Sequence, residues 1–254
     1  MKKKRTIKGV AIIMLLLSML GLAGCTKDTE KQMDKDNAKA IEFLNKKYNK
    51  EFKISEDIHE VASIGGNAAR LRQGRAYYVD KQEETFWVYV DSNNDEVYGD
   101  TYQNITMRPY AQEYYEKIMK NNWTHCKTDV ELECMATKEQ VYSKENYETY
   151  LTNEGGSASV MVFIQSSGDN TQKEAEDIYL FTKQIKDMGL KGDFTYIYMK
   201  DNSNLSKEKM KDIKKSMNSY IKDGIVLRAC LVFINKLDNL DINEIKKDLD
   251  EKEY

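Results

Sequence analysis

Proline and histidine are scarce in this chain of 254 residues, and each shortage narrows what the protein can be. Pro109 is the only proline, which argues against a proline-rich disordered stalk and for a folded body. The two histidines, His59 and His125, leave little for a histidine-rich metal site or a serine–histidine triad. His59-Glu60 begins like the zinc-protease motif, but Ser63 occupies the position of the second histidine ligand. The sequence therefore predicts no catalytic residue, no metal site and no cofactor.

Cysteine is scarce as well, and the first of the four cysteines, Cys25, ends an unusual amino-terminal segment. The segment starts with basic residues, as is typical of segments that insert with their amino end in the cytoplasm. An almost wholly apolar run follows from Val10 to Leu22, and it is shorter than the roughly 20 residues that cross a bilayer core. These features predict a signal peptide over residues 1-24 rather than a permanent membrane span.

The residues Leu22-Ala23-Gly24-Cys25 resemble the lipobox of bacterial lipoproteins. The resemblance covers only the first 25 residues. It implies that the Cys25 sulfur receives a diacylglyceryl group, that the leader is removed and that Cys25 becomes the mature amino terminus. Two acyl chains, at about 0.8 kcal/mol for each buried methylene, give stable anchoring. The resemblance therefore implies a surface lipoprotein, anchored to the extracytoplasmic face of the cell membrane. The excess of lysine over arginine, with many asparagine and isoleucine residues, favours a Gram-positive type.

The charge balance changes once the leader is removed. Five of the 39 basic residues and none of the 42 acidic residues lie before Cys25, so the mature chain has a formal net charge of −8. An acidic body argues against nucleic acid and anionic lipid as partners of the folded part. The membrane is therefore expected as a partner through the lipid anchor, alongside an unidentified protein or small ligand.

The chain after the leader is long enough for one large or two small domains. Residues 25-37 are charged and have no apolar period, which predicts a flexible, lipidated tether. Residues 38-137 and 138-254 follow as two predicted domains, which join between Thr137 and the Gly155-Gly156 pair.

The first predicted domain is a helix packed on an antiparallel sheet. Ala40, Ile41, Leu44 and Tyr48 form one apolar helical stripe. Runs rich in aromatic and β-branched residues then predict four strands, Phe52 to Ser63, Arg75 to Asp80, Glu84 to Asp91 and Glu96 to Gln103. Pro109 suits the first turn of a second helix, predicted to end near Lys120. This order predicts an α+β fold, and similar layouts occur in cystatin-like domains, an analogy at the level of the fold alone.

The second predicted domain is a smaller α/β unit of the βαβαβ type. Its apolar strand candidates are Ser157 to Gln165, Phe194 to Met199 and Ile225 to Asn235. Helical stretches separate or follow them near Gln172 to Met188, Ser206 to Lys222 and Ile242 to Leu249. Alternation of strands with long amphipathic helices favours parallel strand pairs.

The cysteines after Cys25 leave a disulfide open. Cys126 and Cys134 are nearest in sequence, and outside the cytoplasm they could pair. If Val130 and its neighbours form a strand, eight extended residues hold the two α-carbons about 26 Å apart, whereas a bridge needs about 7 Å. The bridge therefore requires a chain reversal near Asp129 or Val130. Cys230 lies in an apolar run and is expected to be a small buried hydrophobe.

Two polar groups are candidate binding residues. Arg70, Arg72 and Arg75 follow two glycines and precede two tyrosines, and their guanidinium groups could bind an anion or a partner; the alternative is solvated arginines that balance an acidic surface. Asp91, Asn93 and Asp95 begin like a calcium loop, but Glu96 and Tyr102 replace its required glycine and its last acid, so a polar hairpin tip is favoured.

The function expected from these observations is a non-enzymatic binding or protein-interaction module on a membrane anchor. The tyrosine-rich first domain favours this interpretation, because aromatic residues are enriched at interfaces. The alternative is a surface hydrolase that uses paired carboxylates such as Asp95, Asp100 or Glu154. An exposed patch of aromatic and arginine side chains would favour binding, and a cleft with two converging acids would favour hydrolysis.

Overall fold

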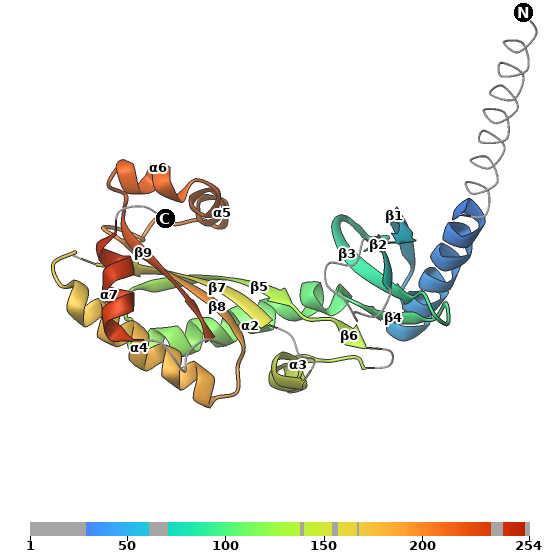
Figure 1. Ribbon diagram of the computed structural model, residues 1–254, viewed down its shortest axis with the longest axis horizontal. Coiled ribbons are helices and arrows are strands. Elements are labelled where there is room, and N and C mark those ends of the chain that lie inside the picture. Colours follow the sequence, from blue (N-terminus) through green and yellow to red (C-terminus); the bar gives the residue numbers. More distant parts are fainter. Residues whose placement is uncertain are drawn as a thin grey trace, which may run out of the picture. The chain divides into compact units, whose positions relative to one another are not determined.

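The computed structural model describes residues 29-60, 71-137, 140-153, 157-166, 168-234 and 241-251. The chain divides into two compact units, Met1–Asp100 and Thr101–Tyr254. Helices and β-strands occur in both units (Figure 1). The predicted α+β class is confirmed.

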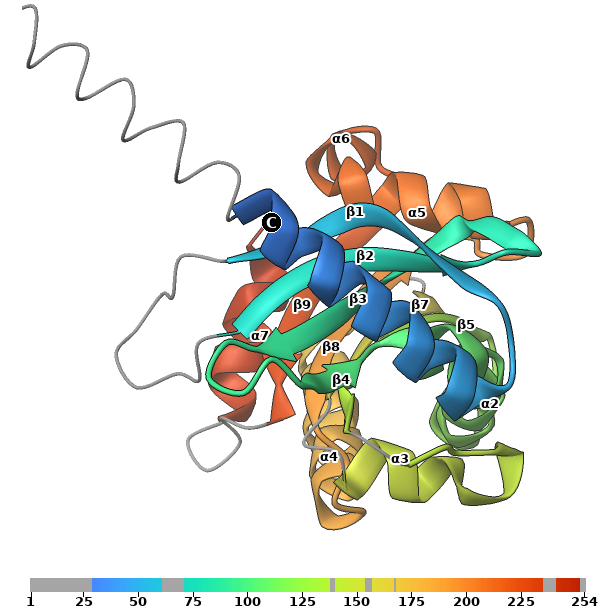
Figure 2. The ribbon, with the colours of Figure 1, turned by 90° about the vertical axis from the view of Figure 1, so that its right-hand side faces the viewer.

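The first unit is a helix packed on an antiparallel sheet. The helix covers residues 29-48 and lies across one face of the sheet (Figure 2). The strands follow in space the order that they have in sequence, namely β1 (Phe52–Glu60), β2 (Leu71–Tyr78), β3 (Lys81–Asp91) and β4 (Val97–Asp100). This is the layout predicted for the first domain, although β4 ends at Asp100 and the chain is helical from Tyr102.

Alternation along β3 explains how the helix is held. Phe86, Val88 and Val90 point to the helix side and are almost fully buried. The helix contributes Ala40 and Leu44, both completely buried, from the stripe that the sequence predicts. Full burial of one such aliphatic or aromatic side chain stabilises a fold by about 1.5–3 kcal/mol. The helix is therefore an integral part of this core.

The segment predicted to be a flexible tether is helical where the structure describes it. Residues 29-37 form the first turns of the helix, and Cys25 to Asp28 lie outside the described residues. The cause is electrostatic, because Asp36 is completely buried and pairs with Arg72 of β2. A pattern of apolar residues cannot show a helix face that is held by an ion pair.

The second unit contains a mixed sheet in the order β5-β7-β8-β9. The strands are β5 (Cys126–Glu133), β7 (Ser157–Gln165), β8 (Gly192–Met199) and β9 (Val226–Phe233). β7 and β8 are parallel and are joined through the helix α4 (Thr171–Asp187), as the predicted βαβ unit requires. β9 instead runs antiparallel to β8, as β5 does to β7, so only one pair in this sheet is parallel.

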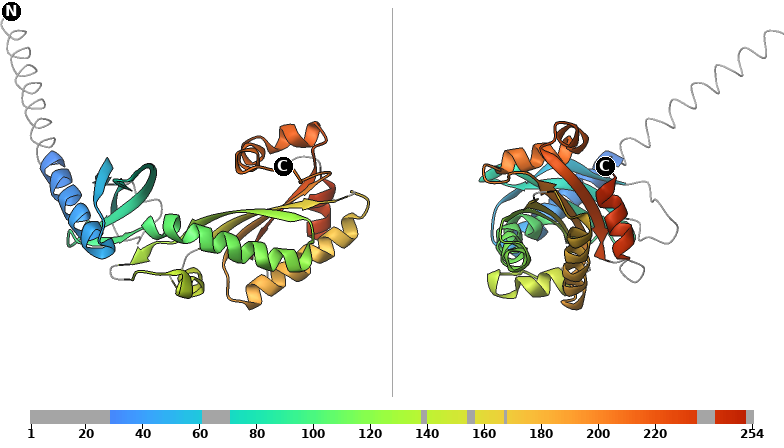
Figure 3. Two further views of the ribbon diagram at one scale, coloured as in Figure 1. Left: turned by 180° about the vertical axis from the view of Figure 1, so that it is seen from behind. Right: turned by 90° about the vertical axis from the view of Figure 1, so that its left-hand side faces the viewer.

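Helices cover both faces of this sheet (Figure 3). One core joins the sheet to α2 (Tyr102–Asn122), α3 (Tyr147–Asn153), α4 and α7 (Ile242–Asp250). The other joins it to α5 (Lys207–Lys215) and α6 (Met217–Lys222) through Met210, Ile213 and Met217. The sequence predicts α5 and α6 as one helix, but the helix breaks at Ser216. The short elements η1 (Lys144–Asn146) and β6 (Ala136–Thr137) complete the unit.

The boundary between the units differs from the predicted one. It follows Asp100, whereas the sequence suggests a junction after Thr137, and the second unit is the larger of the two. The reason is α2, which begins seven residues before Pro109 and packs its residues Met107, Ala111 and Tyr115 into the core of the second unit. Asn104 fixes the extra turns, since its Oδ1 accepts hydrogen bonds from the Cys134 amide at 3.1 Å and the Tyr150 hydroxyl at 2.5 Å.

Candidate functional site

Four charged side chains form a cluster in the first unit, where the helix meets the sheet. Arg72 on β2 donates from Nη2 to Asp36 Oδ1 at 3.2 Å and to Asp95 Oδ1 at 2.6 Å. Its Nε lies 2.7 Å from Asp36 Oδ2. Lys35 on the helix donates to Asp95 Oδ2 at 2.8 Å. This cluster, Lys35, Asp36, Arg72 and Asp95, ties the helix to both β2 and the turn after β3.

The contacts within the cluster shift the pKa of Asp95 and of Arg72. The hydrogen bond from Lys35, and then that from Arg72, hold the pKa of Asp95 well below its usual range. Burial alone would lower the pKa of Arg72, but the hydrogen bond to Asp95 and the charge of Asp36 raise it. The contacts between the two cations and the two carboxylates therefore favour the charged forms of Asp95 and Arg72.

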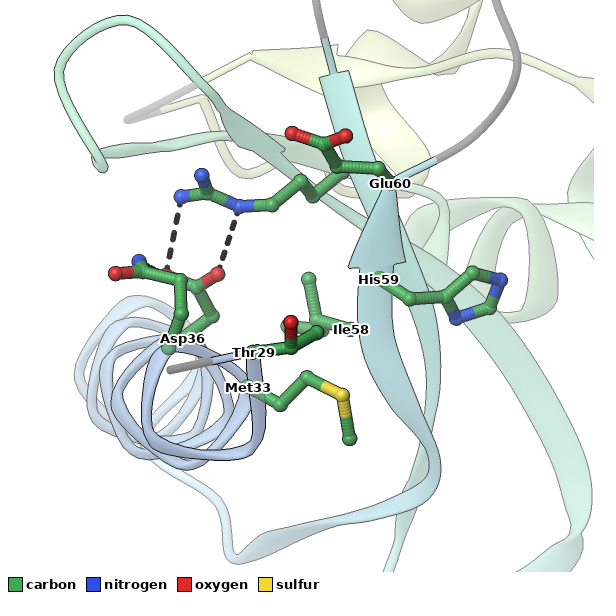
Figure 4. Close-up of a pocket in the computed structure, with 8 residues that line it drawn as sticks. Thr29, Met33, Asp36, Ile58, His59 and Glu60 are labelled. Carbon is green, nitrogen blue, oxygen red and sulfur yellow. Dashed lines mark hydrogen bonds and ion pairs between the residues drawn. The ribbon is translucent and has the colours of Figure 1, made fainter. Parts of the chain in front are cut away.

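A hollow of about 550 Å³ adjoins this cluster, between the start of the helix and the end of β1 (Figure 4). Met33 and Ile58 supply its apolar part, and Glu60 stands above them at the end of β1 (Figure 4). The His59 side chain points away from the helix. The full lining consists of Thr29, Gln32, Met33, Asp36, Ile58, His59, Glu60 and Arg72.

Charged groups of opposite sign lie side by side at this hollow. Glu60 and Arg72 are directly opposite each other in the antiparallel register of β1 and β2, so their side chains share one face of the sheet. Arg72 uses Nε and Nη2 within the cluster, and its Nη1 makes no hydrogen bond to any described residue. Glu60 likewise has no ion-pair partner in the described part of the chain. Among the described residues, one cationic donor and one anionic acceptor at the hollow therefore have no partner.

The three candidate arginines do not form one binding site. Arg70 lies outside the described residues, and Arg72 is buried and holds the helix instead of facing solvent. Arg75 lies on the other face of β2, where it is 3.5 Å from Glu56 and its guanidinium is 4.2 Å above the Trp87 ring. The three arginines therefore do not act as one group, and neighbouring carboxylates already hold Nε and Nη2 of Arg72.

Cys126 and Cys134 are not joined by a disulfide. β5 pairs with β7 without a register shift from Cys126 to Glu133, so the chain does not reverse near Asp129. An extended strand of this length separates its ends far beyond the reach of a disulfide. Burial raises the pKa of Cys126 to about 11 and that of Cys230 to about 12, which makes both poor nucleophiles at neutral pH.

The carboxylates suggested for hydrolysis or calcium binding are engaged elsewhere or lie outside the described residues. Asp95 belongs to the cluster, and Asp100 is fully buried, where it accepts from Lys47 at 2.9 Å and from the Tyr48 hydroxyl at 2.8 Å. Glu154 lies outside the described residues. Among the residues that are described, no three histidine, cysteine or acidic side chains are placed to hold a metal ion.

Sequence reasoning missed Asp36, Met33 and Glu60 as site residues. The first two lie in the segment read as a tether, and Glu60 is one of many acids in the chain. The sequence offers no clear signal for them, because Arg72 lies in a largely polar stretch, Leu71-Arg72-Gln73-Gly74-Arg75, and only the structure shows that its side chain is buried and paired.

Comparisons with known proteins leave the family of this chain open. No family model and no curated protein matches it. The chain is similar to the solved structure of a DUF5037 family protein from Ruminococcus gnavus, with 14% sequence identity and a TM-score of 0.31, over 64% of this chain and 74% of that one. No helix in the described part of the chain is both long and apolar enough to cross a membrane.

Proposed function

We propose that this protein is a lipoprotein anchored to the extracytoplasmic face of the cell membrane through Cys25, and that its folded part is a non-enzymatic binding module. The hollow in the first unit is its binding site. The observation that carries the proposal is this hollow of about 550 Å³, which combines an apolar part with one available cationic and one available anionic group.

The size and composition of the hollow support binding. Small-molecule sites typically measure about 300–1,000 Å³ and are lined by apolar groups with a few placed polar ones. The charged cluster beside it is balanced and held by short hydrogen bonds, so the wall of the site is pre-formed. A pre-formed site spends little binding free energy on ordering its own side chains.

The position of the hollow supports the link to an anchor. Thr29, which lines it, is four residues after Cys25, and four residues of chain span at most about 14 Å. A lipid on Cys25 would therefore keep the hollow close to the membrane surface. The alternative of a surface hydrolase has less support, because Asp95 and Asp100 are both held by cations within the fold.

Mass spectrometry of the protein from membranes tests the anchor. We expect a chain that starts at Cys25 and carries a diacylglyceryl group, and we expect Cys25→Ser to release the protein from the membrane fraction. A full-length chain with an unmodified leader, recovered from the cytosol, would contradict the proposal. Cys230→Ser is the matched control, and it should leave the protein on the membrane.

The binding role needs a separate test. Capture of the intact protein from detergent-solubilised membranes should recover a stoichiometric protein partner or a small ligand that mass spectrometry identifies. Turnover of glycan or ester substrates by the purified protein would instead support the hydrolase alternative.

A further inference from the structure

We propose that the hollow of the first unit binds a small zwitterion with one apolar substituent, that is, a free apolar α-amino acid. The inference rests on the proposed binding function and names its class of ligand. The argument uses the hydrogen-bonding groups that are available at the hollow, the apolar surface beside them, and the volume.

The available donors define one end of the ligand. Nε and Nη2 of Arg72 are used by Asp36 and Asp95, which leaves the donors on Nη1. Nη1 is a cationic hydrogen-bond donor, which favours an anionic acceptor such as one oxygen of a carboxylate. Because Asp36 and Asp95 hold the other donors, the Arg72 side chain is already oriented before a ligand arrives.

The available acceptor defines a second group on the same end. Glu60 is the cross-strand neighbour of Arg72, at a pair distance of about 5 Å between β-carbons. A ligand whose carboxylate binds Arg72 therefore brings its own α-substituents close to the Glu60 carboxylate. An ammonium group at that position pairs with Glu60, which is exposed and has no ion-pair partner among the described residues, whereas a ligand without a cation does not gain this attraction.

The apolar part of the hollow defines the remaining substituent. Met33 and Ile58 lie between the helix and β1, below Glu60 (Figure 4). Methionine fills irregular space and adapts its shape, which suits contact with an aliphatic or aromatic side chain. The volume of about 550 Å³ accommodates a ligand of amino-acid size. A carboxylate, an ammonium group and an apolar side chain on one small frame satisfy all three parts of the hollow.

Calorimetry on the mature lipidated protein, which begins at Cys25, in detergent micelles tests this inference. The probes are L-leucine, L-methionine and L-phenylalanine, together with three truncated compounds that each lack one group. L-leucinamide lacks the carboxylate, 4-methylpentanoate lacks the ammonium group and glycine lacks the apolar side chain. We expect saturable binding of at least one of the three amino acids, and at least tenfold weaker binding of each truncated compound.

Substitution of Glu60 assigns the binding to this hollow. Glu60→Gln should weaken binding of the amino acid at least tenfold and leave the affinity for 4-methylpentanoate unchanged, because that compound has no ammonium group to lose. Glu83→Gln, at an exposed position of β3 away from the hollow, is the matched control and should bind as the wild type does.

Three outcomes overturn the inference. They are no saturable binding of any of the three amino acids at millimolar concentration, equal binding of the amino acid and 4-methylpentanoate, and equal binding by Glu60→Gln and the wild type. Failure here with recovery of a different ligand from membranes means that the ligand class is wrong while the binding function stands. If the protein isolated from cells carries no lipid on Cys25 and still binds the amino acid, the anchor is wrong while the site stands.

Discussion

Removal of the Arg72 charge is the sharpest test of the first unit. The substitution Arg72→Met keeps most of the aliphatic stem. It leaves Asp36, which is completely buried, with Gln32 Nε2 at 2.9 Å as its side-chain hydrogen-bond donor among the described residues. Breaking a buried ion pair by removing one partner costs about 3–5 kcal/mol. Because Gln32 still donates to Asp36 and Lys35 still pairs with Asp95, we expect the low end, about 3 kcal/mol.

Hydrogen exchange measured by mass spectrometry reports this loss locally. Since about 1.4 kcal/mol corresponds to a tenfold change in an equilibrium constant, amides of the helix over residues 29-48 should exchange about 100-fold faster in Arg72→Met. Amides of α4, in the second unit, should exchange at an unchanged rate and serve as the internal reference.

Two further variants make the reasoning refutable. Arg75→Met removes an exposed arginine from the same strand, so its effect should stay below about 1 kcal/mol. The double variant Asp36→Leu with Arg72→Met removes both partners of this buried ion pair and should recover most of the lost stability. Helix exchange in Arg72→Met within threefold of the wild type would show that the ion pair does not hold the helix.

The remaining predictions concern strain, pH and thiols. Gly192 has φ +139°, and a Cβ there would lie 1.9 Å from the Ala158 carbonyl oxygen. Gly192→Ala should therefore lower the free energy of unfolding by well over about 1 kcal/mol, the loss expected for Gly189→Ala, where φ is +74° and no atom would lie within 4 Å of the new Cβ. Urea unfolding followed by circular dichroism compares the two variants. The pKa of Asp95 is lower in the folded than in the unfolded protein, where it is about 3.9, so its carboxylate stabilises the fold above that pH. This contribution disappears as the pH falls through the lowered folded value, so the free energy of unfolding of the wild type should fall more steeply than that of Asp95→Asn below about pH 4. Urea titrations that give the same difference between the two proteins at every pH would contradict this. Cys126, Cys134 and Cys230 should all react with a thiol reagent in urea but only slowly in the native protein at pH 8, and recovery of fewer free thiols from these three positions would reveal a disulfide.

Most of the secondary structure followed from the sequence, because periodicity reports burial directly. β7 was predicted with its observed bounds, and α4 and α7 were predicted to within one residue at each end. The prediction failed at two places where the hydrophobic pattern continues. Asn104 adds turns to α2 before Pro109 through its hydrogen bonds, and the helix breaks at Ser216, whose side chain makes no capping hydrogen bond.

The candidate site was less predictable than the fold. Arg72 was singled out, but for binding an external anion, whereas its partners are Asp36 and Asp95 at sequence distances of 36 and 23 residues. Choosing those two among 42 acidic residues requires the register of β1 and β2 and the placement of the helix over the sheet. The lipidation of Cys25 remains a prediction from the sequence.

The sequence by itself determined the alternation of helices and strands, the acidic charge and the case for a lipid anchor, since each of these is a local property of neighbouring residues. Only the tertiary structure decided the boundary after Asp100, the absence of a disulfide between Cys126 and Cys134, and the ion pair by which Arg72 holds the helix. The physical reason is that an ion pair or a shared core depends on which distant residues meet. A buried charge is tolerated only where the fold brings it a partner, and the order of residues along the chain does not name that partner.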